Sequence, residues 1–138
     1  MKIDSFKGDF YFLSNMFPCK IEYDGIEFNS VEQAYQYQKT TSTKERSIIL
    51  QCETPKDAKL KSKRFKFIRE DWYEVNLEIM YELLKLKFDI PELKEALELT
   101  RGIDLVEVNW WGDRYWGVYN GRGENHLGKL LMKIRDGS

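Results

Sequence analysis

The 138-residue sequence has few of the residues that build disulfide-bonded, metal-binding or histidine-dependent sites. It holds two cysteines and one histidine, and the cysteines, Cys19 and Cys52, do not stand at metal-ligand spacing. We therefore expect a reducing compartment, the cytoplasm, with no disulfide framework and no metal site. The net charge of −1 excludes a global field that would draw the protein onto nucleic acid or a membrane, but it leaves room for a local basic patch.

Long apolar runs and a signal-peptide pattern are also absent, so no membrane association is expected. The length predicts one domain over residues 1–138. With 42% hydrophobic and 33% charged residues, the composition is typical of a globular protein. The unusual feature is the aromatic content of 14%, because three of the four tryptophans, Trp110, Trp111 and Trp116, fall in a glycine-rich stretch.

Local patterns predict an α+β fold that is mainly α-helical, with short antiparallel strands. Alternating apolar residues around Asp24-Gly25 predict a hairpin over Cys19–Phe28, because both turn residues tolerate the positive φ of a type I′ turn. Small polar residues and prolines ahead of a helical period mark the helix starts. Helices are expected after Ser30, Ser42 and Thr54 (to about Arg64), over Trp72–Phe88, from Pro91 to near Gly102 and after Asn125, with strands at Phe10–Leu13 and Asp104–Val108.

The first unusual segment is NSVEQAYQYQK, residues 29–39. Helical spacing aligns Glu32, Gln36 and Lys39 on one face, with Tyr35 beside them. A solvated polar face is the ordinary interpretation of such spacing. The opposite face, however, offers a poor apolar stripe, which favours a second interpretation in which the polar side is buried around a ligand.

The second unusual segment is NWWGDRYWGVYNGRGENHLG, residues 109–128, with five glycines. Glycine lets a backbone approach a ligand closely, and exposed aromatic rings stack on bases or sugars. A helix that starts at Asn125 would point backbone N–H groups at an anion such as phosphate, with help from Arg122. The ordinary alternative is a long surface loop with aromatic residues folded under it, and the glycine spacing is not a dinucleotide-binding fingerprint.

A series of short motifs runs along the chain: FLSNMFP, VEQAYQYQK, TPKDAK, DW followed by EIM, LKF, LKEALELT, DLVEV, DRYWG and GENHLGKLLMKIR. Together these motifs resemble the YbiA/NADAR family of riboflavin-intermediate N-glycosidases and ADP-ribose-related domains. The order and spacing of these motifs make the match specific, and they run almost end to end. Gln33 stands where the family often has histidine, which leaves the choice of substrate open, and Ser62 stands where a glycine is expected.

The resemblance implies an enzyme without metal or cofactor that cleaves an N-glycosidic bond between ribose and a nitrogenous group. Some members act on early riboflavin intermediates, and others remove ADP-ribose from guanine. The implied partners are therefore a small phosphorylated ribosyl substrate or ADP-ribosylated nucleic acid. The resemblance places Glu32, Lys39, Trp72, Asp113 and Trp116 in the pocket, and further substrate-binding candidates are Asn15, Phe17, Tyr35, Gln36, Trp111, Arg122 and Asn125.

Breaking a ribosyl C–N bond builds positive charge on the sugar, which a nearby carboxylate stabilises, and a carboxylate can also activate water. Glu32 and Asp113 are the two candidates. Glu107 is held in reserve, because a solvent-facing position on a strand is its simpler interpretation. Lys39 has two open roles: it holds a phosphate or orients Glu32, or it forms a Schiff base with the opened sugar of a glycosylamine.

Three classes of function remain. An N-glycosidase is favoured, a non-catalytic ADP-ribose or nucleotide-binding module would not need Glu32, and an interaction protein would use the tryptophans to contact a partner. The basic run KLKSKRFKFIR, Lys59–Arg69, is either a solvated helix end or a docking surface for phosphate or nucleic acid. The single histidine, His126, is expected to be structural, and both cysteines are expected to be buried and inert.

Overall fold

The structure is a computed structural model that describes residues 1–137, and its internal packing forms two compact units. Unit 1 holds residues 1–14 and 88–137, and unit 2 holds residues 15–87. In both units helices dominate and strands are short, which confirms the predicted α+β, mainly helical class. A single domain over residues 1–138 stays a prediction, since each unit is described by itself.

Unit 2 begins with the predicted hairpin. Strand β2 (Ile21–Tyr23) pairs antiparallel with β3 (Ile26–Phe28), and the turn residues Asp24 and Gly25 have φ values of 50° and 78°. Both values lie in the left-handed region that a type I′ turn requires, so the prediction is confirmed. Four helices follow: α1 (Val31–Lys39), α2 (Thr43–Leu50), α3 (Pro55–Ser62) and α4 (Trp72–Lys87).

Small polar side chains start the first three of these helices. Each accepts a hydrogen bond from the backbone amide three residues further on, as predicted, and the three are Ser30, Ser42 and Thr54. In α1 and α2 the side chain of the third helical residue also accepts hydrogen bonds from backbone amides outside its own helix. Gln33 Oε1 accepts from the Asn29 amide at 2.7 Å, and the Glu45 carboxylate accepts from the amides of Lys66 and Phe67.

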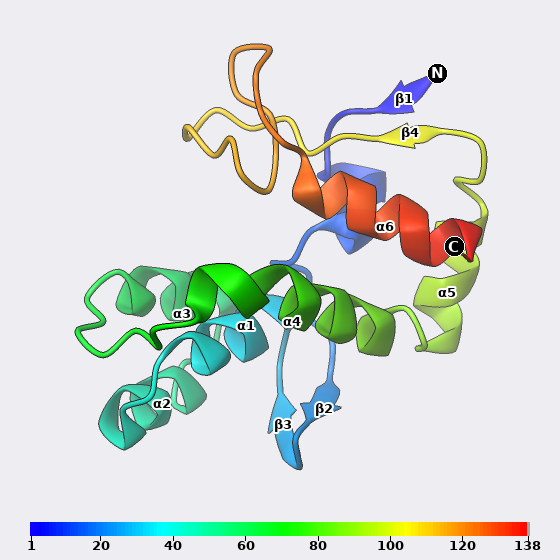
Figure 1. Cartoon of the computed structure of the whole chain (residues 1–138). Helices are drawn as coiled ribbons and strands as arrows, with labels where there is room; N and C mark the ends of the chain where they lie inside the picture. Colours follow the sequence, from blue (N-terminus) through cyan, green and yellow to red (C-terminus); the bar gives the residue numbers. More distant parts are fainter. Residues whose placement is uncertain (138) are drawn as a thin grey trace. The chain divides into compact units, whose positions relative to one another are not determined.

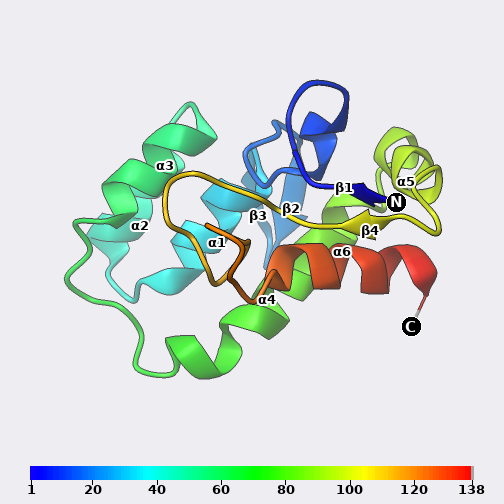
Figure 2. The ribbon, with the colours of Figure 1, turned by 90° about the horizontal axis from the view of Figure 1, so that it is seen from above.

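Helix α1 packs against α2, α3 and α4, and Figures 1 and 2 show it beside all three. Seven of its nine residues are buried, including Glu32, Gln33 and Gln36. The solvated-face interpretation is therefore wrong, and the burial of the polar side is confirmed. Burial is tolerated because amides find partners inside the protein, as when Gln33 Nε2 donates to the carbonyl of Ile49 at 3.0 Å.

The long helix α4 supplies much of the apolar core of unit 2 through Ile79, Met80, Leu83 and Leu84. Leu86, which continues the helical spacing of Ile79 and Leu83, does not share this inner face, because it is 37% exposed. The inner face instead follows the i, i+4, i+7 and i+11 positions from Asn76 and ends on Lys87, which is fully buried.

In unit 1, β1 (Lys2–Ile3) pairs with β4 (Asp104–Leu105), and the pairing is parallel. The strand predicted over Asp104–Val108 is shorter than expected because β1 offers only two residues to pair with. The strand predicted at Phe10–Leu13 is wrong. Those residues end a 3₁₀ helix, η1 (Gly8–Leu13), in which only Leu13 is buried, so no alternating face exists.

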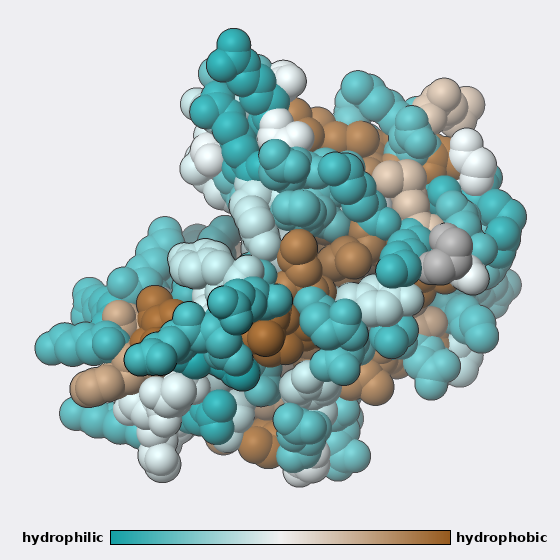
Figure 3. All heavy atoms as spheres, viewed as in Figure 1, coloured by the Kyte–Doolittle hydropathy of each residue, from teal (hydrophilic) through white to brown (hydrophobic). Residues whose placement is uncertain are grey.

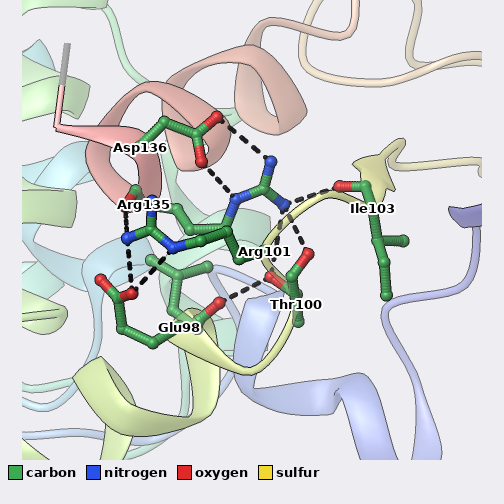
Figure 4. A network of polar contacts seen from close by, with 7 residues as sticks. Glu98, Thr100, Arg101, Ile103, Arg135 and Asp136 are labelled. Atoms are coloured by element: carbon green, nitrogen blue, oxygen red, sulfur yellow. Dashed lines mark hydrogen bonds and ion pairs between the residues drawn. The ribbon is translucent and has the colours of Figure 1, made fainter.

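Two helices complete unit 1, α5 (Pro91–Glu98) and α6 (His126–Asp136). Buried Arg135 ties the two together (Figure 4): its Nη1 donates to the carbonyls of Thr100 at 2.9 Å and Ile103 at 2.6 Å. A cationic side chain thus satisfies carbonyls just beyond the C-terminal end of α5. Arg101 adds a bond from Nη2 to the carbonyl of Arg135 at 3.1 Å.

The buried amine at the end of α4 makes the stability of the protein depend on pH. Burial lowers the pKa of Lys87 from 10.5 to about 7, so between these values the unfolded chain binds a proton that the folded protein does not. The free energy of unfolding therefore rises with pH in this window. We expect Lys87→Met to lose this rise, which amounts to at most about 1.4 kcal/mol per pH unit.

The measurement is urea denaturation at pH 7.0, 7.75 and 8.5 on wild type, Lys87→Met and the matched exposed control Lys85→Met. The control keeps the wild-type slope, because its amine is solvated in both states. A Lys87→Met variant whose stability rises with pH as steeply as that of wild type would show that the amine is protonated in the folded protein.

Candidate active site

The carboxylate of Glu32 is buried and held within unit 2. Its side chain is 9% exposed, and Gln36 Nε2 donates to Glu32 Oε2 at 2.7 Å from the next turn of α1. The Glu32 amide donates to the carbonyl of Asn15 at 3.2 Å, which joins the start of α1 to the loop before the hairpin. A buried carboxylate fixed by an amide group is positioned to act on a cationic centre.

Lys39 closes the same helix, seven residues after Glu32, on the face that Glu32 occupies. It is half-buried. Burial lowers the pKa of the Lys39 amine, and the negative charge of Glu32 opposes that shift in part. A lysine with a lowered pKa has more of its amine in the neutral, nucleophilic form at physiological pH.

An aromatic pair lies between α1 and α4. Trp72, 2% exposed, has its ring centroid 4.9 Å from that of Tyr35. Asn76 Nδ2 donates to the Tyr35 hydroxyl at 3.4 Å. Asn76 was not among the predicted residues, although it stands four positions after Trp72 and so shares its helix face.

Two buried acceptors in this region have no donor among residues 1–137. They are Asn15 Oδ1 and Gln36 Oε1, and both residues also contact Glu32 as described above. Buried polar atoms are nearly always paired, so such acceptors mark places that bind water or the hydroxyl groups of a ligand. Phe17, two residues after Asn15, lies with its ring 5.5 Å from the Nζ of Lys87.

In unit 1 the carboxylate of Asp113 organises its own loop. Asp113 Oδ1 accepts from the amides of Tyr115 at 3.0 Å and Trp116 at 2.9 Å. Buried Asn109 fixes Asp113 from the other side, accepting from its amide at 2.9 Å and donating to its carbonyl at 2.7 Å. One carboxylate oxygen of Asp113 thus fixes the backbone that carries Trp116. The Trp116 ring packs edge-on against the rings of Tyr115 and His126.

Asn125 stands at the N-cap position of α6, as predicted, but its side chain does not cap the helix. Asn125 has a left-handed backbone and no capping bond, because its side chain donates to Leu105 O at 3.0 Å and accepts from the Glu107 amide at 3.0 Å. These two hydrogen bonds to the backbone of Leu105 and Glu107 therefore fix the Asn125 side chain away from the start of α6. Arg122 is exposed in a tight turn with Tyr119, and Trp111 is 45% exposed.

Two glycines of this segment serve packing within unit 1. A Cβ on Gly117 would come 2.1 Å from the carbonyl oxygen of Glu107, and a Cβ on Gly128 would come 2.1 Å from that of Leu105. Both contacts are impossible for any other residue, so close backbone packing accounts for these glycines without a ligand. Glu107, expected to face solvent, is half-buried.

Unit 2 therefore carries seven of the predicted residues and unit 1 carries the other five. A cleft shared by Glu32 and Asp113 stays a prediction, as does contact between Arg122 and a phosphate. Within residues 1–137 no cluster of three or more His, Cys, Asp or Glu side chains could hold a metal ion. No helix in the same range combines the length and apolar character needed to span a bilayer.

Comparison with known proteins identifies the class. The NADAR domain model matches residues 4–137, and the chain belongs to the NADAR domain family. The NMR structure of the Escherichia coli protein YbiA superposes with a TM-score of 0.85 at 31% identity, covering 99% of this chain and 86% of that one. The resemblance inferred from the motifs is thereby confirmed.

Relatives with curated names support an N-glycosidase function for the chain. The N-glycosidase YbiA of Shigella boydii is 36% identical over 132 residues, which are 94% of this chain and 80% of that protein. An N-glycosidase of Nostoc punctiforme is 34% identical over 129 residues, 89% of this chain and 82% of that protein. A riboflavin biosynthesis protein of Vibrio vulnificus is 32% identical over 128 residues, and the chain spans only 35% of its length.

The hydrogen bonds of Asp113 generate a prediction about its role. Asp113→Asn keeps an oxygen for the amides of Tyr115 and Trp116 and should leave stability near the wild-type value. Asp113→Ala removes that acceptor and should lower the free energy of unfolding by about 1–3 kcal/mol. Urea denaturation measures both, with the exposed pair Asp4→Asn and Asp4→Ala as the control. Equal stability of Asp113→Asn and Asp113→Ala would contradict a loop-organising role.

Proposed function

We propose that the chain is an N-glycosidase that hydrolyses the C–N bond between a ribose or ribose phosphate and a nitrogenous group. Suitable substrates are a ribosylaminopyrimidine intermediate of riboflavin biosynthesis or ADP-ribosylated guanine. The observation that carries the proposal is the buried Glu32 carboxylate, held at 2.7 Å by Gln36, on the helix that also carries Lys39. The alternative is a module that binds ADP-ribose or a related nucleotide without catalysis.

In the first step, departure of the nitrogen leaves positive charge on the sugar ring. The Glu32 carboxylate stabilises this charge, and its fixed position means that little reorganisation is needed as the charge develops. The same carboxylate can take a proton from the attacking water. Gln36 fixes one oxygen of Glu32, so the carboxylate is held in place for the substrate.

Lys39 offers a covalent route to the same products. A glycosylamine opens to an imine at the anomeric carbon, the neutral Lys39 amine adds to that carbon, and the original nitrogen leaves as an amine. Water then hydrolyses the lysine imine, which releases the free sugar and restores Lys39. The lowered pKa of Lys39 supports this route, since only the neutral amine can add.

The other predicted residues support binding of a phosphorylated ribosyl ligand. Tyr35 and Trp72 supply a rigid aromatic wall, and Asn15 and Gln36 offer unsatisfied acceptors to sugar hydroxyls. Phe17 belongs to the same unit, while Trp111, Asp113, Trp116, Arg122 and Asn125 remain proposed contacts from unit 1. We place the enzyme in the cytoplasm, where the free thiols of Cys19 and Cys52 stay reduced.

The catalytic role of Glu32 predicts a loss of turnover. Glu32→Gln keeps the shape and an acceptor for Gln36 but deletes the charge, so kcat should fall by about a hundredfold or more while KM changes less. Steady-state hydrolysis of a ribosylaminopyrimidine phosphate and of ADP-ribosylated guanine measures this. Glu74→Gln, an exposed carboxylate on α4, is the control. Turnover that survives within a factor of a few would favour the binding module.

The covalent route predicts an adduct on Lys39. Borohydride added during turnover should reduce the lysine imine to a stable amine, so that mass spectrometry finds the sugar on Lys39. Lys39→Arg keeps the positive charge but cannot form the imine, and should lose both the adduct and most of the activity. Lys44→Arg is the control on α2. An active Lys39→Arg enzyme without an adduct would assign Lys39 to phosphate binding instead.

A further inference from the structure

Four exposed cationic residues lie close together in the sequence, where α3 ends and the loop before α4 begins. They are Lys61, Lys63, Arg64 and Lys66, and residues 59–69 are called the basic segment below. Because the whole chain carries a net charge of −1, this is a local concentration of positive charge. The ion pairs found within residues 1–137 include none of the four.

The basic segment is held firmly against the end of α1. Ile68 forms a β-bridge with Thr40, the Arg69 amide donates to Lys39 O at 3.0 Å, and the Thr41 amide donates to Phe67 O at 2.9 Å. The segment is therefore fixed to the backbone of Lys39 and to the two residues that follow it. Whatever binds on the segment lies beside the C-terminal end of α1.

An aromatic ring stands among these cations. The Phe67 side chain is 58% exposed although both backbone groups of the residue are bonded, the amide to Glu45 Oε1 at 3.4 Å and the carbonyl to Thr41. The backbone of Phe67 is thus anchored while its ring lies exposed at the surface. Figure 3 shows this loop, at the lower left, as mainly hydrophilic atoms with apolar atoms beside them.

Positive charge lies along the loop of the basic segment, whereas carboxylates gather in a hollow beside it. A hollow of about 610 Å³ adjoins the segment, and Glu45, Glu53 and Asp57 share its lining with Lys61 and Arg64. Those carboxylates disfavour a phosphate inside the hollow. An anionic chain is therefore expected to run over the loop itself, past Lys63, Lys66 and the Phe67 ring.

From these observations we propose that the basic segment docks single-stranded nucleic acid. Lys63 and Lys66 contact backbone phosphates, a base stacks on Phe67, and Lys61 and Arg64, at the edge of the hollow, add to the positive charge that attracts the strand. Cations that track a backbone together with an exposed ring are the arrangement that binds single strands without sequence preference. A duplex offers the phosphates but hides the base faces, so it gains less from the ring. The proposal rests on the proposed function in one respect: a strand docked on this segment lies beside the end of the helix that carries Glu32 and Lys39.

The test is the fluorescence anisotropy of a labelled 12-nucleotide oligodeoxythymidine titrated with the full chain at 25 to 200 mM salt. The variant Lys61→Gln/Lys63→Gln/Arg64→Gln/Lys66→Gln should bind at least tenfold more weakly. Its slope of log affinity against log salt should be shallower by about 0.7 for each phosphate that the variant no longer neutralises. The charge-matched control changes four exposed lysines of unit 1 to glutamine, Lys2, Lys7, Lys94 and Lys129, and should bind as wild type does.

A second comparison isolates the ring. Phe67→Leu should weaken binding about tenfold, and Phe67→Trp should retain it and show tryptophan quenching when the oligonucleotide is added. Tyr73→Leu removes an 81% exposed ring on α4 and serves as the control. Equal binding by wild type and the quadruple variant, or no binding at 25 mM salt, would overturn the proposal. If polyglutamate binds as tightly as the oligonucleotide and Phe67→Leu changes neither affinity, the nucleic acid proposal is overturned and an acidic protein partner is favoured.

Failure of this inference is distinguishable from failure of the proposed function. Binding is measured without turnover, so a chain that binds the oligonucleotide but hydrolyses nothing refutes only the N-glycosidase proposal. The quadruple variant should hydrolyse a small ribosylaminopyrimidine phosphate as wild type does, because none of its four residues lies in the proposed active site. A chain that hydrolyses the small substrate but fails the binding test refutes only the docking surface.

Discussion

Helix α1 is buried on almost every side although most of its residues are polar, and the arrangement of unit 2 depends on satisfying it. Three other helices surround α1, and the Gln33 side chain bonds to both the turn before α1 and the end of α2. A buried amide without such partners costs free energy comparable to a lost hydrogen bond. The polar helix therefore fixes where its neighbours lie, a role that helices usually fill with an apolar stripe.

Burial also sets the chemistry of the two charged groups on α1. Taking Glu32 and Lys39 out of water is unfavourable for both charged forms, and their mutual attraction offsets only part of that cost. Replacing them with apolar residues would suit a purely structural helix better. Their presence in a buried position is understandable if the reaction needs a fixed carboxylate and an amine of lowered pKa, which is the combination that N-glycoside cleavage can use.

In loop 109–125 the residue types that suggest a ligand site also serve to build the loop itself. Glycine, asparagine and aspartate in a tryptophan-rich stretch favour a ligand site, yet here Gly117 makes room for a neighbouring carbonyl and Asn125 bonds to the end of β4. Asp113 likewise supports the backbone of Trp116. A side chain that organises a loop and one that meets a ligand are drawn from the same residue types, because both tasks need short polar groups close to a backbone.

The sequence by itself determined the hairpin at Asp24-Gly25, the starts of α1, α2 and α3, and the family, because turn and capping chemistry act within a few residues and motif order is written along the chain. Only the tertiary structure decided that η1 is a 3₁₀ helix, that β1 and β4 pair in parallel, that Leu86 faces solvent while Lys87 is buried, and that the polar face of α1 is enclosed. Each of these depends on what a distant segment packs against, and a local pattern of polar and apolar residues does not contain that information.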